Sequence, residues 1–299
     1  MNANLEETIS LIIKNLRSET FVPPVQSLVD IDFYKFTMGQ FIHRFYPDEI
    51  VTFRLIIRDK NVRLFQYVNL EDLERAFEHI ASLSFRKTDL YYLRGMDLYD
   101  KYLFGEDYLS FLKTVKLSGY KIAQVDGGIE ITFTGRWCEV SLWETMALAT
   151  VSELYYRGVM KHLSDDEIRS LYIVADNRLH NNLLEIKTHP NIRFADFGQR
   201  RRNGYLWQKY VIREAVRVLG EQFIGTSNTR MAIKLNLNPI GSIAHEPIMV
   251  VTALANSDDE MRHAQYKVLE QWQEMYGQGL RIFLPDTYGS EQFFAGAPD

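Results

Sequence analysis

The stretch that decides the fold sets three polar clusters behind three short apolar runs. Phe197-Gly198-Gln199-Arg200-Arg201-Arg202 follows residues 192–194, Gly225-Thr226-Ser227-Asn228 follows residues 222–224, and Ala244-His245-Glu246 follows residues 239–243. Each apolar run is typical of a strand, and a helical pattern follows each cluster. Strands that end in polar residues, repeated along a chain, are how a parallel α/β barrel presents an active site at one face.

The residue types in these clusters suit phosphate chemistry. Arg200 and Arg201 can grip an anion through paired N–H donors, and the Thr226-Ser227-Asn228 turn can offer backbone N–H groups at a helix start. His245 beside Glu246 can take a proton or a phosphoryl group. The plainer alternatives are a solvated arginine face, a simple helix cap and a core histidine.

The front half reads as a mixture of helices and strands. The pattern predicts helices over residues 5–16, 36–45, 70–83, 88–99 and 106–112, strands over 51–58, 120–124 and 129–134, and extended chain over 135–140. A turn is expected at Asp126-Gly127-Gly128, and a long helix over 142–160. The capping box Ser164-Asp165-Asp166-Glu167 begins another helix, which runs towards residue 186.

The rhythm changes to strand, loop and helix after residue 192. Helices are predicted over 204–219, 229–237 and 258–275, and strands over 223–224, 240–244 and 280–284. We therefore predict an α/β protein with an α+β domain over residues 1–140 and an irregular βα barrel over 141–299. The barrel is expected to be incomplete, because eight strands need typically ~250 residues, and to stop without a terminal helix.

Composition excludes several classes of protein. The 299 residues carry a net charge of −5 and are 46% hydrophobic, which indicates a packed globular chain without a chain-wide nucleic-acid surface. The single cysteine, Cys138, allows no intrachain disulfide or multi-cysteine zinc site, and is expected to be a small buried residue in a reducing cytoplasm. No apolar run approaches ~18 residues, so no membrane contact is expected.

The segment Asp30-Ile31-Asp32-Phe33-Tyr34-Lys35 is dense in acidic, aromatic and basic side chains. Tyr34, like Phe197, could stack on a planar ring. The alternative is a helix start with Asp32 as its cap and Tyr34 packed beneath it.

The chain resembles the nicotinate phosphoribosyltransferase family. The matching stretches are Leu28-Val29-Asp30-Ile31-Asp32-Phe33-Tyr34-Lys35-Phe36-Thr37-Met38, Val140-Ser141-Leu142-Trp143-Glu144, Glu153-Leu154-Tyr155-Tyr156-Arg157, and the three clusters around residues 197–202, 225–228 and 241–246. They occur in the family's order over nearly the whole chain. The resemblance implies a barrel of the type II phosphoribosyltransferase kind.

The resemblance also implies the reaction and its partners. Nicotinate and phosphoribosyl pyrophosphate would give nicotinate mononucleotide and pyrophosphate, the first step of NAD salvage from nicotinate, with magnesium and with ATP hydrolysis coupled through a phosphohistidine at His245. Tyr34 and Phe197 would stack on nicotinate, Arg200 or Arg201 would hold its carboxylate, and Glu246 would orient His245. A cytoplasmic homodimer is expected, with Tyr34 acting in the site of a partner subunit.

Two departures from the family leave alternatives open. Gln199 stands where Thr or Ser is commoner, and the chain stops before the segment that binds the ribose and phosphate of the donor. Either the chain is a shortened form or a second polypeptide completes the barrel. The alternatives to the nicotinate enzyme are a nicotinamide phosphoribosyltransferase-like enzyme and a non-catalytic half-barrel subunit.

Overall fold

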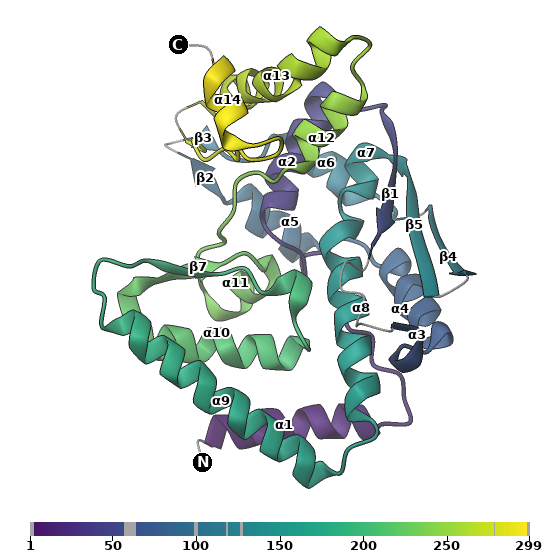
Figure 1. Cartoon of the computed structure of the whole chain (residues 1–299), viewed down its shortest axis with the longest axis vertical. Helices are drawn as coiled ribbons and strands as arrows, with labels where there is room; N and C mark the ends of the chain where they lie inside the picture. The colour runs from purple at the N-terminus through teal and green to yellow at the C-terminus, as the bar shows by residue number, and fades with distance from the viewer. Residues whose placement is uncertain are drawn as a thin grey trace.

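A computed structural model describes residues 3–56, 64–98, 101–117, 119–125, 128–277 and 279–297. The predicted turn at residues 126–127, and residues 57–58 and 99 of two predicted elements, lie outside these ranges. Figure 1 shows a three-stranded sheet on one side of the long helix α8 and a group of helices on the other.

The front half is built from short helices packed on an antiparallel sheet. Its elements are α1 (Ala3–Arg17), α2 (Tyr34–Phe45), β1 (Ile50–Leu55), α3 (Leu64–Tyr67), α4 (Leu70–Ser82), α5 (Lys87–Arg94), β2 (Asp97–Leu98), β3 (Lys101–Tyr102), α6 (Glu106–Thr114), β4 (Tyr120–Val125), β5 (Gly128–Arg136), α7 (Trp137–Val140) and α8 (Trp143–Met160). The strand order is β1-β5-β4, with Phe133 of β5 opposite both Phe53 and Tyr120. Phe133 is buried, so this register places it in the core.

Two predictions for the front half are wrong in detail. Residues 137–140 form the helical turn α7 instead of extended chain, because Trp137, Cys138 and Val140 are all buried and no single face of a strand could bury all three. The predicted helix over 88–99 ends at Arg94, where Gly95 follows and the chain turns into β2.

The back half is mostly helical. Its elements are α9 (Asp165–Lys187), β6 (Phe194–Asp196), the 3-10 turn η1 (Gln199–Arg201), α10 (Tyr205–Leu219), the 3-10 turn η2 (Gly220–Gln222), β7 (Phe223–Thr226), α11 (Thr229–Leu235), α12 (Glu246–Ala253), α13 (Asp258–Tyr276) and α14 (Ser290–Gly296). β6 and β7 are parallel, as the strand–loop–helix pattern predicts. The capping box at Ser164 is confirmed at the start of α9.

The predicted strands over 240–244 and 280–284 do not form in the described chain. After one parallel bridge between Thr226 and Pro239, the backbone turns at Gly241, which has a φ of 140° and passes against Tyr34. Near residue 280, backbone carbonyls that could pair with a neighbouring strand accept hydrogen bonds from side chains instead. The Trp272 indole donates to the Leu280 carbonyl, and the Ser242 hydroxyl donates to the Ile282 carbonyl. The prediction of no terminal helix is also wrong, because α14 forms there.

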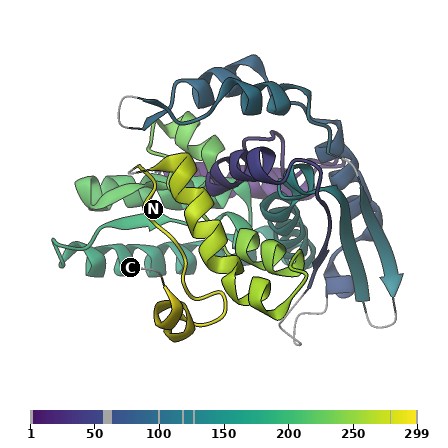
Figure 2. The same cartoon turned by 90° about the horizontal axis from the view of Figure 1, so that it is seen from above.

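One large core joins the two halves of the chain. It contains buried side chains from α2, α4, α6, α7 and α8 together with others from α12 and α13. Figure 2 shows α12 and α13 lying against α2, where the Tyr276 hydroxyl donates to the carbonyl of Thr37 at 2.6 Å. The domain boundary at residue 140 stays a prediction, and this core includes residues on both sides of it.

Candidate functional site

The segment before α2 and the turn after β7 form one hydrogen-bonded unit. The Phe33 amide donates to the Ser227 carbonyl at 2.6 Å, and the Thr229 amide donates to the Ile31 carbonyl at 3.0 Å. Asn228 caps α11 by accepting from the Met231 amide, while its own amide group donates to Asp30 at 2.8 Å. Two segments that lie about two hundred positions apart in the sequence are thereby fixed together at the end of the parallel strands.

The polar side chains of this turn are fully buried and bonded to carboxylates. The Thr226 hydroxyl donates to Asp196 at 2.7 Å, and the Ser227 hydroxyl donates to Asp32. Burial raises the pKa of Asp196, and the hydroxyl bond from Thr226 opposes that effect. In this geometry the turn acts as a helix cap that fixes two acids, and a direct ligand role for Thr226, Ser227 and Asn228 stays a prediction.

The arginine run is divided between the core and the surface. Arg202 is buried and makes a two-pronged ion pair with Asp30, with contacts of 2.8 and 3.1 Å. Burial works to raise the pKa of Asp30, but the neighbouring guanidinium of Arg202 holds it below its usual value. Arg200 and Arg201 are exposed on η1, and Phe197, just before η1, has 54% of its surface exposed. These three side chains are therefore accessible to a ligand.

A buried lysine links the two ends of the site. The Lys35 ammonium, fully buried at the start of α2, makes ion pairs with both Glu144 and Glu246. Glu144 in turn contacts Arg200 at 3.4 Å, and Glu246 accepts from the Trp137 indole at 2.7 Å. Burial alone would lower the pKa of Lys35, but the two carboxylates raise it. The lysine is therefore held charged in the interior.

The neighbouring pair of Tyr34 and Asp32 is also withdrawn from solvent. Tyr34 is 6% exposed, and its hydroxyl donates to Asp32 at 3.3 Å. Burial raises the pKa of Asp32 to about 6, against the opposing hydroxyl bond from Ser227. The alternative prediction, in which Tyr34 packs beneath the start of a helix, describes the position of Tyr34. Its second part is wrong, because the N-cap of α2 is Phe33 and not Asp32. A role for Tyr34 in a partner's site stays a prediction.

His245 stands directly before α12 with 43% of its side chain exposed. Its Nε2 atom lies 3.0 Å from the Asp286 carboxylate, and the bond from His245 lowers the pKa of that carboxyl. The Glu246 carboxylate instead contacts Lys35 and Trp137, so the acid that orients His245 is Asp286. The sequence predicts that Glu246, the residue next to His245 in the chain, orients the imidazole. In the fold, the carboxylate that contacts the imidazole is that of Asp286, 41 positions away.

The sequence analysis gives no role to Lys35 or to its partner Glu144. A signal was present for the lysine, because it stands between the aromatic residues Tyr34 and Phe36. A charge among apolar neighbours indicates a buried, paired group.

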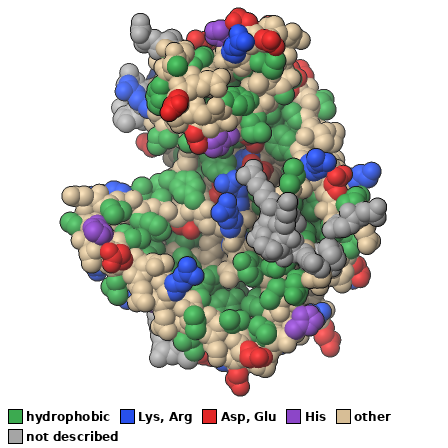
Figure 3. Space-filling model, viewed as in Figure 1, with side chains coloured by type: hydrophobic (Ala, Val, Ile, Leu, Met, Phe, Trp, Pro, Cys, Tyr) green, Lys and Arg blue, Asp and Glu red, His purple; other side chains and the backbone are tan. Residues whose placement is uncertain are grey.

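The face that carries these side chains is hollowed. Figure 3 shows Lys and Arg side chains gathered in the hollow between the helices α12–α14 and the helices α9–α11.

Within the described ranges, no group of three or more His, Cys, Asp or Glu side chains is placed to hold a metal ion. No described helix is long and apolar enough to cross a membrane.

Comparisons with known proteins agree with this architecture. The family model for the nicotinate phosphoribosyltransferase N-terminal domain matches residues 29–152, and the model for the nicotinate phosphoribosyltransferase family matches residues 192–298. Among solved structures, nicotinate phosphoribosyltransferase from Porphyromonas gingivalis superposes with a TM-score of 0.77 at 25% identity over 92% of this chain. The enzyme from Vibrio cholerae gives 0.71 at 27% identity over 88% of it.

A third structure, from Saccharomyces cerevisiae, has a TM-score of 0.75 at 24% identity over 92% of this chain and supports the fold. The chain spans 67%, 59% and 67% of the lengths of these three proteins, in the order given.

Proposed function

The chain belongs to the nicotinate phosphoribosyltransferase family, and on that premise we propose that it joins nicotinate to phosphoribosyl pyrophosphate. The products are nicotinate mononucleotide and pyrophosphate, and ATP hydrolysis is coupled to the reaction through His245. The observation that carries the proposal is the exposed His245 imidazole paired with Asp286, on the chain that also presents Arg200 and Phe197.

The nicotinate site is proposed at η1. An exposed aromatic ring such as Phe197 suits a flat pyridine, and a guanidinium suits its carboxylate. Among the described residues, the hydrogen bonds of Arg200 are limited to one with Glu144 at 3.4 Å, so most of its N–H donors remain for a ligand. The buried Lys35 holds Glu144 and thus positions Arg200 from behind.

The phosphoryl step is proposed at His245. In this step Nε2 carries the proton and donates a hydrogen bond to the Asp286 carboxylate. Nδ1 then keeps its lone pair and is the nucleophile. That nitrogen attacks the γ-phosphorus of ATP, an N–P bond forms, and the P–O bond to the ADP leaving group breaks. The phosphorylated ring gains negative charge, which changes the affinity of the site for anionic substrates.

Magnesium enters this proposal as part of the substrates. Because no three-ligand cluster lies within the described residues, we place Mg²⁺ on the phosphate oxygens of ATP and phosphoribosyl pyrophosphate. The same proposal includes a homodimer and a cytoplasmic location. The location is supported by the single thiol, Cys138, which is free and buried, as its sequence context predicts.

The test is the ratio of ADP to nicotinate mononucleotide formed by His245→Ala. We expect the variant to lose substrate-coupled ADP formation while it stays folded, because no other group replaces the nitrogen nucleophile. His263→Ala is the matched control, since His263 is also an exposed histidine paired with an aspartate, Asp259. ADP formed in step with product by His245→Ala would refute the assignment.

A further inference from the structure

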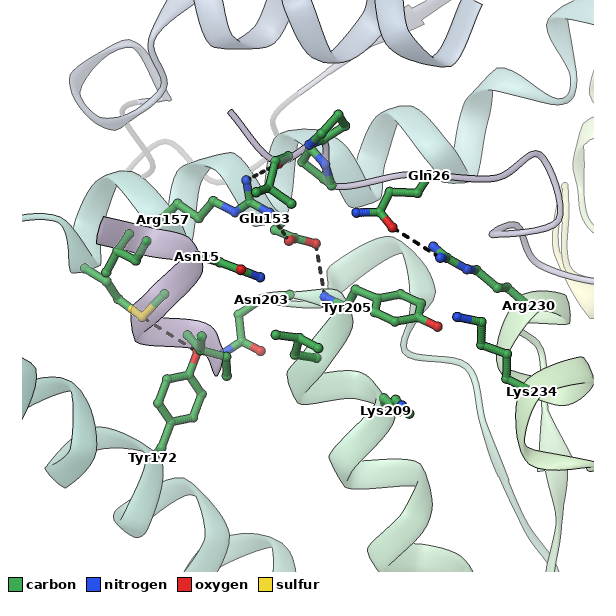
Figure 4. A pocket seen from close by; sticks show the side chains of 18 residues that line it. Asn15, Gln26, Glu153, Arg157, Tyr172, Asn203, Tyr205, Lys209, Arg230 and Lys234 are labelled. Atoms are coloured by element: carbon green, nitrogen blue, oxygen red, sulfur yellow. Dashed lines mark hydrogen bonds and ion pairs between the residues drawn. The ribbon is translucent and has the colours of Figure 1, made fainter. Parts of the chain in front are cut away.

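A cavity of about 270 Å³ is lined by residues other than those of the proposed reaction site. Its walls come from α1, the segment over residues 22–26, α8, and the first turns of α10 and α11 (Figure 4). None of the side chains assigned to nicotinate or ATP lines it. The cavity therefore needs an explanation of its own.

The charged groups lining this cavity are mostly cations. Arg157, Lys209, Arg230 and Lys234 line it, against the single carboxylate of Glu153. That carboxylate is already occupied, since it pairs with Arg157 at 2.6 Å and accepts from the Tyr205 amide at 3.0 Å.

The other three cations keep unneutralised charge. Arg230 lies 3.5 Å from Asp30, which Arg202 already neutralises. Within the described ranges, no carboxylate oxygen lies within 4.0 Å of the Lys209 or Lys234 ammonium nitrogen, which is the limit for an ion pair.

These lysines are held in a field of like charge. Burial lowers the pKa of Lys209, and Arg213 and Arg230 lower it further, while Glu7 opposes them. Burial likewise lowers the pKa of Lys234, with added repulsion from Arg230, Lys209 and Arg86 against Asp30. An anion placed between them would relieve this repulsion.

Tyr205 supplies an unused hydrogen-bonding group at the same place. The Arg230 guanidinium lies 4.5 Å from the centre of its ring, and the Lys234 ammonium lies 5.8 Å from it. Its hydroxyl is buried and has no hydrogen-bond partner in the part of the chain that the structure describes. Figure 4 shows the ring extending between Arg230 and Lys234, with Lys209 beyond it. A buried hydroxyl without a hydrogen-bond partner destabilises the fold, so a hydrogen bond to a ligand oxygen would be favourable.

We propose that this cavity binds a small phosphate-bearing metabolite, held by Lys209, Arg230, Lys234 and the Tyr205 hydroxyl. The lining also includes the apolar side chains of Leu16, Val22 and Pro23, which are available to an organic part of the ligand. The site is separate from the proposed reaction and does not depend on it. Its position where α1 meets α8 and α10 means that an occupant would join the N-terminal helix to the back half.

The test is calorimetric titration with inorganic pyrophosphate in the absence of divalent ions. We expect Lys209→Met/Lys234→Met to weaken binding at this site at least tenfold, because two charge-assisted contacts are lost. Lys113→Met/Lys121→Met is the matched control: it removes the same charge from two exposed lysines outside the cavity and should leave the Kd unchanged. Arg200→Met, at the proposed reaction site, should retain binding in the cavity.

Tyr205→Phe provides an independent variant that keeps the ring and removes only the hydroxyl. It should weaken binding several-fold while the free energy of unfolding does not fall, since the hydroxyl has no partner to lose. Wild-type affinity in both the double lysine variant and Tyr205→Phe would overturn the proposal. So would loss of all pyrophosphate binding in Arg200→Met alone.

Discussion

Replacing Asp32 with Asn should make the protein more stable as the pH rises. Asp32 is buried and accepts hydroxyl bonds from Ser227 and Tyr34. An amide keeps the same shape, can accept from Ser227, and can donate to the Tyr34 oxygen. The substitution therefore removes a buried titration and little else.

The magnitude follows from the pKa of Asp32, which burial raises from 3.8 to about 6. A folded-state pKa above the unfolded value means that the protonated acid stabilises the fold. That stability is fully present below pH 3.8 and is lost as the pH rises through 6. Asn is never ionised, so the advantage of Asp32→Asn over the wild type should grow by about 2 to 3 kcal/mol between pH 4 and pH 8.

The assay is urea unfolding at a series of pH values, followed by the fluorescence of buried tryptophans such as Trp143. Asp286→Asn is a control of opposite sign. The bond from His245 lowers the pKa of Asp286, so its stabilising effect is lost as the pH falls. A difference between Asp32→Asn and wild type that stays constant with pH, or shrinks as the pH rises, would refute the reasoning.

Three further substitutions test the network around Lys35 and the pair of His245 with Asp286. Lys35→Met should lower the free energy of unfolding by about 3–5 kcal/mol, because Glu144 and Glu246 lose a buried partner. Urea unfolding measures this change, and a loss below about 1 kcal/mol would contradict the prediction. Arg200→Met should raise the KM for nicotinate roughly tenfold or more but change stability by less than about 1 kcal/mol, because its pair with Glu144 is half-exposed; steady-state kinetics with an unchanged KM would refute its role. Asp286→Asn should reduce ADP formation per product about tenfold or more, whereas wild-type coupling would show that His245 needs no orienting acid.

Local signals in the sequence were sufficient for most helices. Ser164 caps its helix by accepting from the amide of the third residue on, as the capping box predicts, and Ser257 caps α13 in the same way. Local sequence signals failed for residues 240–244 and 280–284, whose apolar runs are typical of strands. There the outcome is decided by distant groups, namely the close pass of Gly241 over Tyr34 and the bond from Trp272 to the chain near residue 280.

The sequence predicts candidate site residues where exposure and residue type coincide. Phe197, Arg200 and His245 were proposed from chemistry and resemblance, and all three reach the surface, while their roles stay predictions. Arg202 could not be told from Arg200 in one basic run, because its partner Asp30 lies 172 positions away. Asp286 was missed for the same reason, since it becomes relevant only when the fold brings it to His245.

The most direct test of the account is turnover by the 299-residue chain supplied with phosphoribosyl pyrophosphate, ATP and Mg²⁺, and with either nicotinate or nicotinamide. We predict nicotinate mononucleotide with ADP formed alongside it, and strong discrimination against nicotinamide, because the role proposed for Arg200 is to bind a carboxylate. Equal use of nicotinamide, or no product from a folded chain that binds nicotinate, would contradict the account.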